Sequence, residues 1–150
     1  MRVVIQRVSQ AAIHIDGKLH SEINDGLLVL LGIENADNQQ DIDWLVNKIV
    51  GLRVFDDQHG VMNLNINETA GELLLISQFT LHASTRKGNR PSYIKAAKPD
   101  VAIPIYEAFI KSISCRINKG VKTGVFGAEM KVELINDGPV TIIIDTKNKE

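Results

Sequence analysis

The most constraining feature of the sequence is a run of apolar residues that ends in a polar cluster, at positions 71–81. The run begins Gly-Glu-Leu-Leu-Leu-Ile, which is typical of a buried, central strand. Its polar end consists of Ser77, Gln78, Phe79 and Thr80. A basic loop with glycine and proline follows at residues 82–98. Because a strand fixes what the next loop presents, this strand end is the first candidate for a functional site.

Length and composition indicate an ordinary globular protein. The 150 residues predict one compact domain that spans residues 1–150. Hydrophobic residues make up 44% of the chain and charged residues 23%, and both fractions are usual for soluble proteins. The formal net charge is −1, so no overall field attracts nucleic acid. Any contact with nucleic acid must therefore come from a local basic patch.

Three further features favour a soluble protein in a reducing compartment. Cys115 is the only cysteine, which excludes an internal disulfide and a four-thiol metal site. No apolar run approaches the roughly 20 residues that span a membrane. The first residues lack the apolar core and cleavage signal of a leader. We therefore expect a cytoplasmic protein, with neither a membrane nor DNA among its partners.

The first half of the chain is expected to contain several short strands and one helix. Strands are expected at residues 3–8, 12–15, 19–23 and 27–33. The Asp16-Gly17 dipeptide predicts a hairpin turn between the second and third of these strands. Apolar residues at helical spacing predict a helix that starts within residues 35–40 and ends near Gly51. A short strand-like piece at residues 53–55 and an irregular edge segment at residues 62–68 complete this half.

The second half is expected to contain the central strand, one helix and two closing strands. The helix should begin at Pro99, which suits a first helical turn, and end with Gly120 as its C-cap. The closing strands are expected at residues 130–135 and 140–144, with an Asn-Asp-Gly-Pro turn at residues 136–139 between them. This order predicts an α+β domain with a mainly antiparallel, barrel-like sheet and two principal helices.

Thr80 is a candidate nucleophile, because its hydroxyl follows the buried strand. A hydroxyl is weak unless a base removes its proton, and His82 is the only histidine near the motif. If the strand continued, Thr80 and His82 would share a face, but two side chains side by side do not make a triad. Two interpretations of Thr80 stay open, a nucleophile or a strand-end threonine bonded to nearby backbone. We interpret His82 as a histidine of a surface loop.

The sequence contains no recognised metal or phosphate signature. It lacks His-x-Glu, Cys-x-x-Cys and histidine pairs at helical spacing. His59 next to Asp56 and Asp57 is typical of a solvated turn rather than a ligand set. The glycine-rich phosphate loops Gly-x-x-x-x-Gly-Lys and Gly-x-Gly-x-x-Gly are also missing. We therefore predict no metal site.

The basic loop offers the local patch that nucleic acid would need. Its charged residues are Arg86, Lys87, Arg90, Lys95 and Lys98, and Tyr93 lies among them. Such a cluster with an aromatic residue could contact phosphates and stack a base. It could equally be a solvated, charged loop.

Two short motifs stand out in the chain. They are Ser77-Gln78-Phe79-Thr80-Leu81 and Asn136-Asp137-Gly138-Pro139-Val140-Thr141. Together they resemble the two signature motifs of the D-aminoacyl-tRNA deacylase family. Residues 4–8, 26–32, 62–65 and 90–92 also look like that family, and the likeness follows the same order over nearly the whole chain.

The resemblance implies a homodimer that cleaves the ester between a D-amino acid and the 3′ end of tRNA, and that also removes glycine mischarged onto alanine tRNA. A cis-linked Gly138-Pro139 motif would enter the Ser-Gln-Phe-Thr site of the partner subunit. Its main-chain oxygens would clash with the Cβ of an L-amino acid, a rejection that glycine escapes. The 2′-hydroxyl of the terminal adenosine would assist the attacking water, and no cofactor is implied.

The resemblance also assigns roles to single residues. Main-chain donors of Phe79 and Thr80 would stabilise the developing oxyanion. Ser77 and Gln78 would shape the pocket, and Arg7 would orient the Gly-Pro motif. The adenine pocket would be lined by Ala102, Phe126 and Met130, of which the last two are nearly as well explained as plain core residues. Arg86, Lys87 and Arg90 of the basic loop would meet the acceptor stem of tRNA.

Two other functions stay open at this stage. Thr80 as a nucleophile would make the protein a conventional esterase. The basic loop and the missing general base would also suit an RNA-binding module without catalytic activity.

Overall fold

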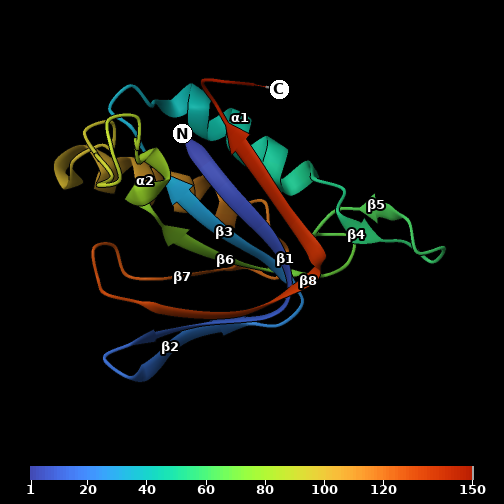
Figure 1. The fold of residues 1–150 in the computed structure, drawn as a ribbon. Helices are drawn as coiled ribbons and strands as arrows, with labels where there is room; N and C mark the ends of the chain where they lie inside the picture. Colours follow the sequence, from blue (N-terminus) through green and yellow to red (C-terminus); the bar gives the residue numbers. More distant parts are fainter. Residues whose placement is uncertain (150) are drawn as a thin grey trace.

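Two long antiparallel strands organise the fold, β1 (Arg2–Ile15) and β8 (Lys131–Asp145). Figure 1 shows them side by side, β1 in blue and β8 in red. On its other edge, β1 pairs first with β3 (Gly26–Gly32) and then with β2 (Lys18–Ile23), both antiparallel. Because β1 pairs with β8 on one edge and with β3 and β2 on the other, it joins both parts of the sheet. The computed structural model describes residues 1–149.

The sheet continues from β3 through two parallel pairs. β6 (Glu72–Ser77) runs parallel to β3, and β7 (Val121–Thr123) runs parallel to β6. The strand order is β2-β1-β3-β6-β7, with β8 on β1, so the sheet curls into a nearly closed barrel. The leucines of β6, at positions 73–75, are fully buried, as expected for a strand covered on both faces. The predicted α+β fold with a mainly antiparallel sheet and a central strand after residue 71 is confirmed.

Two helices cover one face of the sheet, α1 (Gln39–Gly51) and α2 (Pro99–Ser114). The start of α1 is fixed by a capping box, in which Asn38 accepts from the amide of Gln40 at 2.8 Å and Asp41 accepts from the amide of Asn38 at 3.0 Å. The helices pack their apolar sides on β1, β3 and β6 to form the larger core. A smaller apolar cluster fills the inside of the curled sheet. No helix of the described residues is long and apolar enough to cross a bilayer.

Four details of the prediction differ from the structure. Residues 3–8 and 12–15 form one strand, β1, because β8 pairs with both parts. Helix α2 ends at Ser114, with Cys115 as its cap, so Gly120 is not the C-cap. Residues 136–139 are not a hairpin turn, because β8 runs through them and pairs with β1 on either side. The segment at residues 62–68 is partly regular, since β5 (Met62–Leu64) pairs with β4 (Phe55–Asp56).

The close approach of β3 and β6 leads to a stability prediction at Gly26. A Cβ added there would lie 1.9 Å from the backbone oxygen of Glu72. We expect Gly26→Ala to force the two strands apart and to lower the free energy of unfolding by about 1–3 kcal/mol or more. The matched control is Gly51→Ala at the exposed end of α1, where a Cβ meets no atom within 4 Å. Urea unfolding should show the control unchanged or stabilised by about 0.5–1 kcal/mol, and equal stability of both variants would contradict the prediction.

Candidate active site

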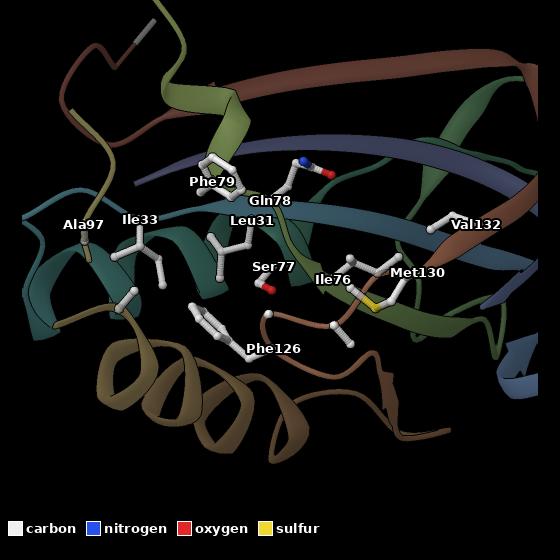
Figure 2. Close-up of a pocket in the computed structure, with 13 residues that line it drawn as sticks. Leu31, Ile33, Ile76, Ser77, Gln78, Phe79, Ala97, Phe126, Met130 and Val132 are labelled. Carbon is white, nitrogen blue, oxygen red and sulfur yellow. The ribbon is translucent and has the colours of Figure 1, made fainter. Parts of the chain in front are cut away.

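A cavity of about 240 Å³ opens where β6 ends. β3 and β6 are parallel, and Leu31 pairs with Ser77, so the ends of both strands reach the same edge of the sheet. Figure 2 shows Ser77 facing the cavity, with Phe79 above it and Phe126 below it. The lining residues are Leu31, Ile33, Ile76, Ser77, Gln78, Phe79, Ala97, Ala102, Phe126, Gly127, Ala128, Met130 and Val132. The cavity thus joins segments that are far apart in the sequence.

Nearly half of the residues that the sequence suggested for the site meet at this cavity. The structure places six of them on its walls: Ser77, Gln78, Phe79, Ala102, Phe126 and Met130. Phe126 and Met130 are only partly buried, so they are wall residues as well as core residues. The small residues Ala97, Gly127 and Ala128 leave the space open, and the sequence analysis missed them. They carry no sequence signal of their own, because they contribute only by having small side chains.

Beyond Ser77 the chain leaves the strand and enters a short 3-10 helix, η1 (Phe79–His82). Thr80 therefore does not lie on a continued strand, and it lines a neighbouring groove together with Arg2 and Ile143. Its hydroxyl accepts a hydrogen bond from Nε2 of Gln78 at 2.6 Å. The first amides of such a turn have no acceptor within it, which leaves the N–H groups of Phe79 and Thr80 without an intrahelical partner.

The interpretation of His82 as a surface-loop residue was wrong. The turn of η1 carries its side chain inward, and only 4% of it is exposed. The ring packs against Gly32 at the end of β3, where an added Cβ would lie 3.0 Å from its Cδ2. Among the described residues, Nε2 of His82 has no hydrogen-bond partner. His82 thus belongs to the packing between η1 and β3.

The wall behind the cavity is neutral. The hydroxyl of Tyr106 on α2 donates to the backbone oxygen of Leu75 at 3.2 Å, and burial raises the pKa of Tyr106 to about 12. The ring of Phe126 lies 5.7 Å from that of Tyr106, tilted by 55°. Within residues 1–149, no group of three or more His, Cys, Asp or Glu side chains could hold a metal ion. The described residues on this side of the cavity therefore offer aromatic and apolar surface.

Gly138 and Pro139 lie in a bulge of β8 rather than at this cavity. Opposite β1, Gln6 pairs with Thr141 and Val8 pairs with Asn136, so the residues between them leave the ladder. The bond between Gly138 and Pro139 is cis, and both residues are exposed. Neither lines the cavity beside Ser77 of the same chain.

Arg7 holds the base of this bulge. Its guanidinium donates to the backbone oxygen of Asp137 at 3.1 Å and to that of Val54 at 2.7 Å. It also forms ion pairs with the carboxylates of Asp137 at 3.2 Å and Asp56 at 3.3 Å. Only 8% of Arg7 is exposed. A buried guanidinium with several fixed acceptors positions its partners strongly, so the bulge has a defined orientation.

The basic loop is irregular, as predicted, and exposes its charges. Arg86, Lys87 and Arg90 line a further cavity of about 300 Å³, formed within the loop itself. Backbone hydrogen bonds between Ser84 and Ser92, of 2.8 and 2.9 Å, close the loop at its base. The cations therefore lie close together on a closed loop.

The chain is similar to known proteins over nearly its whole length. Residues 4–145 match the family described as D-Tyr-tRNA(Tyr) deacylase. Proteins called D-aminoacyl-tRNA deacylase are similar over the whole length of both chains: one from Bacteroides fragilis (strain YCH46) is 67% identical, and one from Parabacteroides distasonis is 61% identical. The chain belongs to the D-Tyr-tRNA(Tyr) deacylase family, a family of hydrolases.

Solved structures show the same fold. One described as a c-Myc DNA unwinding element binding protein has a TM-score of 0.93 at 37% identity, and the match covers 97% of this chain and 99% of that one. Another, described as a probable eukaryotic D-amino acid tRNA deacylase, has a TM-score of 0.81 at 16% identity, with 95% and 97% covered.

Proposed function

We propose that this protein hydrolyses the ester between a D-amino acid and the 3′-terminal adenosine of tRNA. The observation that carries the proposal is the cavity at the end of β6, whose walls include Ser77, Gln78 and Phe79. Over its whole length, the chain that forms this cavity is 67% identical to a protein called D-aminoacyl-tRNA deacylase. Because the substrate is tRNA, we expect the protein to work in the cytoplasm.

The apolar part of the cavity would hold the adenine. Phe126 offers a ring face, and Ala102 and Met130 complete a wall that is apolar and neutral. An adenine base is flat and uncharged, so burial between such groups would favour it. The ester would then lie toward Ser77 and Gln78, next to η1.

The chemistry would depend on position and main-chain donors. Water attacks the ester carbonyl, the bond to the 3′-oxygen breaks, and that oxygen leaves with a proton as the tRNA hydroxyl. The amides of Phe79 and Thr80 would stabilise the oxyanion in between. The hydroxyl of Thr80 is bonded to Gln78 rather than to a base. We therefore assign the assistance of the water to the 2′-hydroxyl of the terminal adenosine.

Chiral selection would come from Gly138 and Pro139 of a second copy of the chain. Both residues are exposed at the tip of a bulge that Arg7 holds, and neither reaches the cavity of its own chain. Main-chain oxygens of the inserted motif would occupy the space that the Cβ of an L-amino acid needs. Glycine has no Cβ, so glycine mischarged onto alanine tRNA would also be hydrolysed.

Exposed apolar residues on β8 support a homodimer. Ile135 is 58% exposed and Ile143 is 69% exposed. Ile143 lines the groove that also contains Thr80, so a partner covering it would lie next to the site. Burial of these side chains would stabilise the dimer through the hydrophobic effect.

The central experiment compares D-tyrosyl-tRNA with L-tyrosyl-tRNA as substrates of the purified protein. We expect the D form to be hydrolysed at least about 100-fold faster, which equals about 2.7 kcal/mol of selectivity in the transition state. Alanine tRNA that has been mischarged with glycine should also be hydrolysed. Equal rates on the D and L forms, or binding without turnover of any of them, would rule the proposal out.

The choice of catalytic group is tested at Thr80. If Thr80 serves only as a hydrogen-bond partner of Gln78, Thr80→Ala should lower kcat by no more than about tenfold. Loss of a true nucleophile lowers kcat on the order of 10⁴-fold or more. Thr69→Ala in an exposed turn serves as the control. A collapse of activity in Thr80→Ala alone would instead support the esterase with a threonine nucleophile.

The matching test on the RNA replaces the 2′-hydroxyl of the terminal adenosine with hydrogen. We expect turnover to fall by about 10²–10⁴-fold, the usual contribution of a positioned proton-transfer group. An unchanged rate would exclude assistance by that hydroxyl.

Gly138→Ala tests the role of the bulge. Gly138 has φ +123°, and an added Cβ would lie 3.0 Å from Nη2 of Arg7. We expect the variant to displace the motif and to lower the ratio of D to L hydrolysis at least tenfold. Gly60→Ala is the control, because it also has a positive φ, +72°, but meets no atom within 4 Å. An unchanged ratio in Gly138→Ala would show that this motif does not select the substrate.

A further inference from the structure

Two exposed aromatic rings meet at the rim of the cavity. Phe79 is 56% exposed and Tyr93 is 39% exposed. Their centroids lie 5.1 Å apart and their planes meet at 75°, so the rings form a corner. Phe79 also lines the cavity, as Figure 2 shows, and the corner therefore continues the cavity outward. Exposed aromatic rings on a soluble protein are common sites of ligand contact.

Tyr93 is held in place although it lies on an irregular loop. On one side, Ser92 pairs with Ser84 through two backbone hydrogen bonds. On the other side, the amide of Ala96 donates to the oxygen of Tyr93 at 3.0 Å, and that of Ala97 donates to Ile33 at 2.9 Å. These bonds fix the backbone around Tyr93 against the end of β3, so little ordering is needed when a ligand binds.

The surroundings of the corner are strongly basic. Residues 79–98 contain five cations and no acidic residue. Within the described part of the chain, none of the five forms an ion pair. Four of them, Arg86, Lys87, Arg90 and Lys95, line a cavity of about 300 Å³. The residues on either side of Tyr93, Ser92 and Ile94, line it too. Cations that are free of protein partners favour a ligand that carries several negative charges.

We propose that Phe79 and Tyr93 form a stacking platform for the unpaired nucleotide that precedes the terminal adenosine of tRNA. This inference depends on the proposed function, which places the terminal adenosine in the cavity. The RNA then leaves the cavity past Phe79, its next base stacks in the corner of the two rings, and its phosphates face the basic loop. Stacking needs no hydrogen bonds to the edges of the base, so the two rings alone could hold it.

Kinetics with two substrates test the platform. One is D-tyrosyl-tRNA, and the other is the D-tyrosyl ester of adenosine alone, which has no preceding nucleotide. We expect Tyr93→Ala to raise the KM for the tRNA about tenfold or more, as for the loss of one stacked base. The KM for the adenosine ester should change less than twofold. Tyr93→Phe keeps the ring and should restore the KM for tRNA, while Met62→Ala on distant β5 controls for loss of an exposed apolar side chain.

A binding measurement separates this inference from the proposed function. The probe is a short RNA with 2-aminopurine as the penultimate base, whose fluorescence falls when the base stacks. The unmodified protein and Tyr93→Phe should quench it, and Tyr93→Ala should not. Absence of quenching, or an equal loss of activity of Tyr93→Ala on both substrates, would overturn the platform. Quenching without hydrolysis of any D-aminoacyl ester would support the platform while refuting the deacylase.

Discussion

The parallel pairing of β3 with β6 is the constraint on which the site depends. Parallel strands end at the same edge of a sheet, so Leu31 and Ser77 come together although they lie far apart in the sequence. The pairing requires a close approach of the backbones at Gly26, where no side chain fits. Beyond this edge the chain must turn, and the cavity opens between the turn and α2.

Arg7 plays a similar part for the second half of the proposed site. It connects three segments that share no regular pairing there, namely β1, the chain at Val54 and the bulge at Asp137. A buried guanidinium is costly unless it is paired, and Arg7 makes three hydrogen bonds and two ion pairs with these segments. Orientation of the exposed Gly138-Pro139 tip thus depends on a residue near the start of the chain.

The sequence predicted most of the buried strands, both helices and six of the residues that line the main cavity, because apolar periodicity and motifs are local signals. It could not predict the direction of strand pairing, since a short apolar run suits either direction. It also placed a hairpin turn at residues 136–139, because an Asn-Asp-Gly-Pro sequence forms a turn or a bulge depending on the strand opposite. The burial of His82 was missed for a related reason. No local signal in the sequence shows that the chain turns into η1 after Ser77, and this turn carries the side chain inward.

In the described part of the chain the hydroxyl of Thr80 is bonded to the amide of Gln78 and not to a base, which changes what the fold has to provide. If the hydroxyl that assists water belongs to the RNA, selection of the correct ester need not come from a reactive side chain. It can come from contacts along the 3′ end, with the adenine in the cavity and the preceding base on Phe79 and Tyr93. The amino acid itself would then need few favourable contacts. Its chirality would be selected by a steric clash with the L form rather than by a pocket that binds the D form. On this proposal the site would discriminate against one hand of the amino acid while it accepted many side chains, which is the combination that editing of D-aminoacyl esters requires.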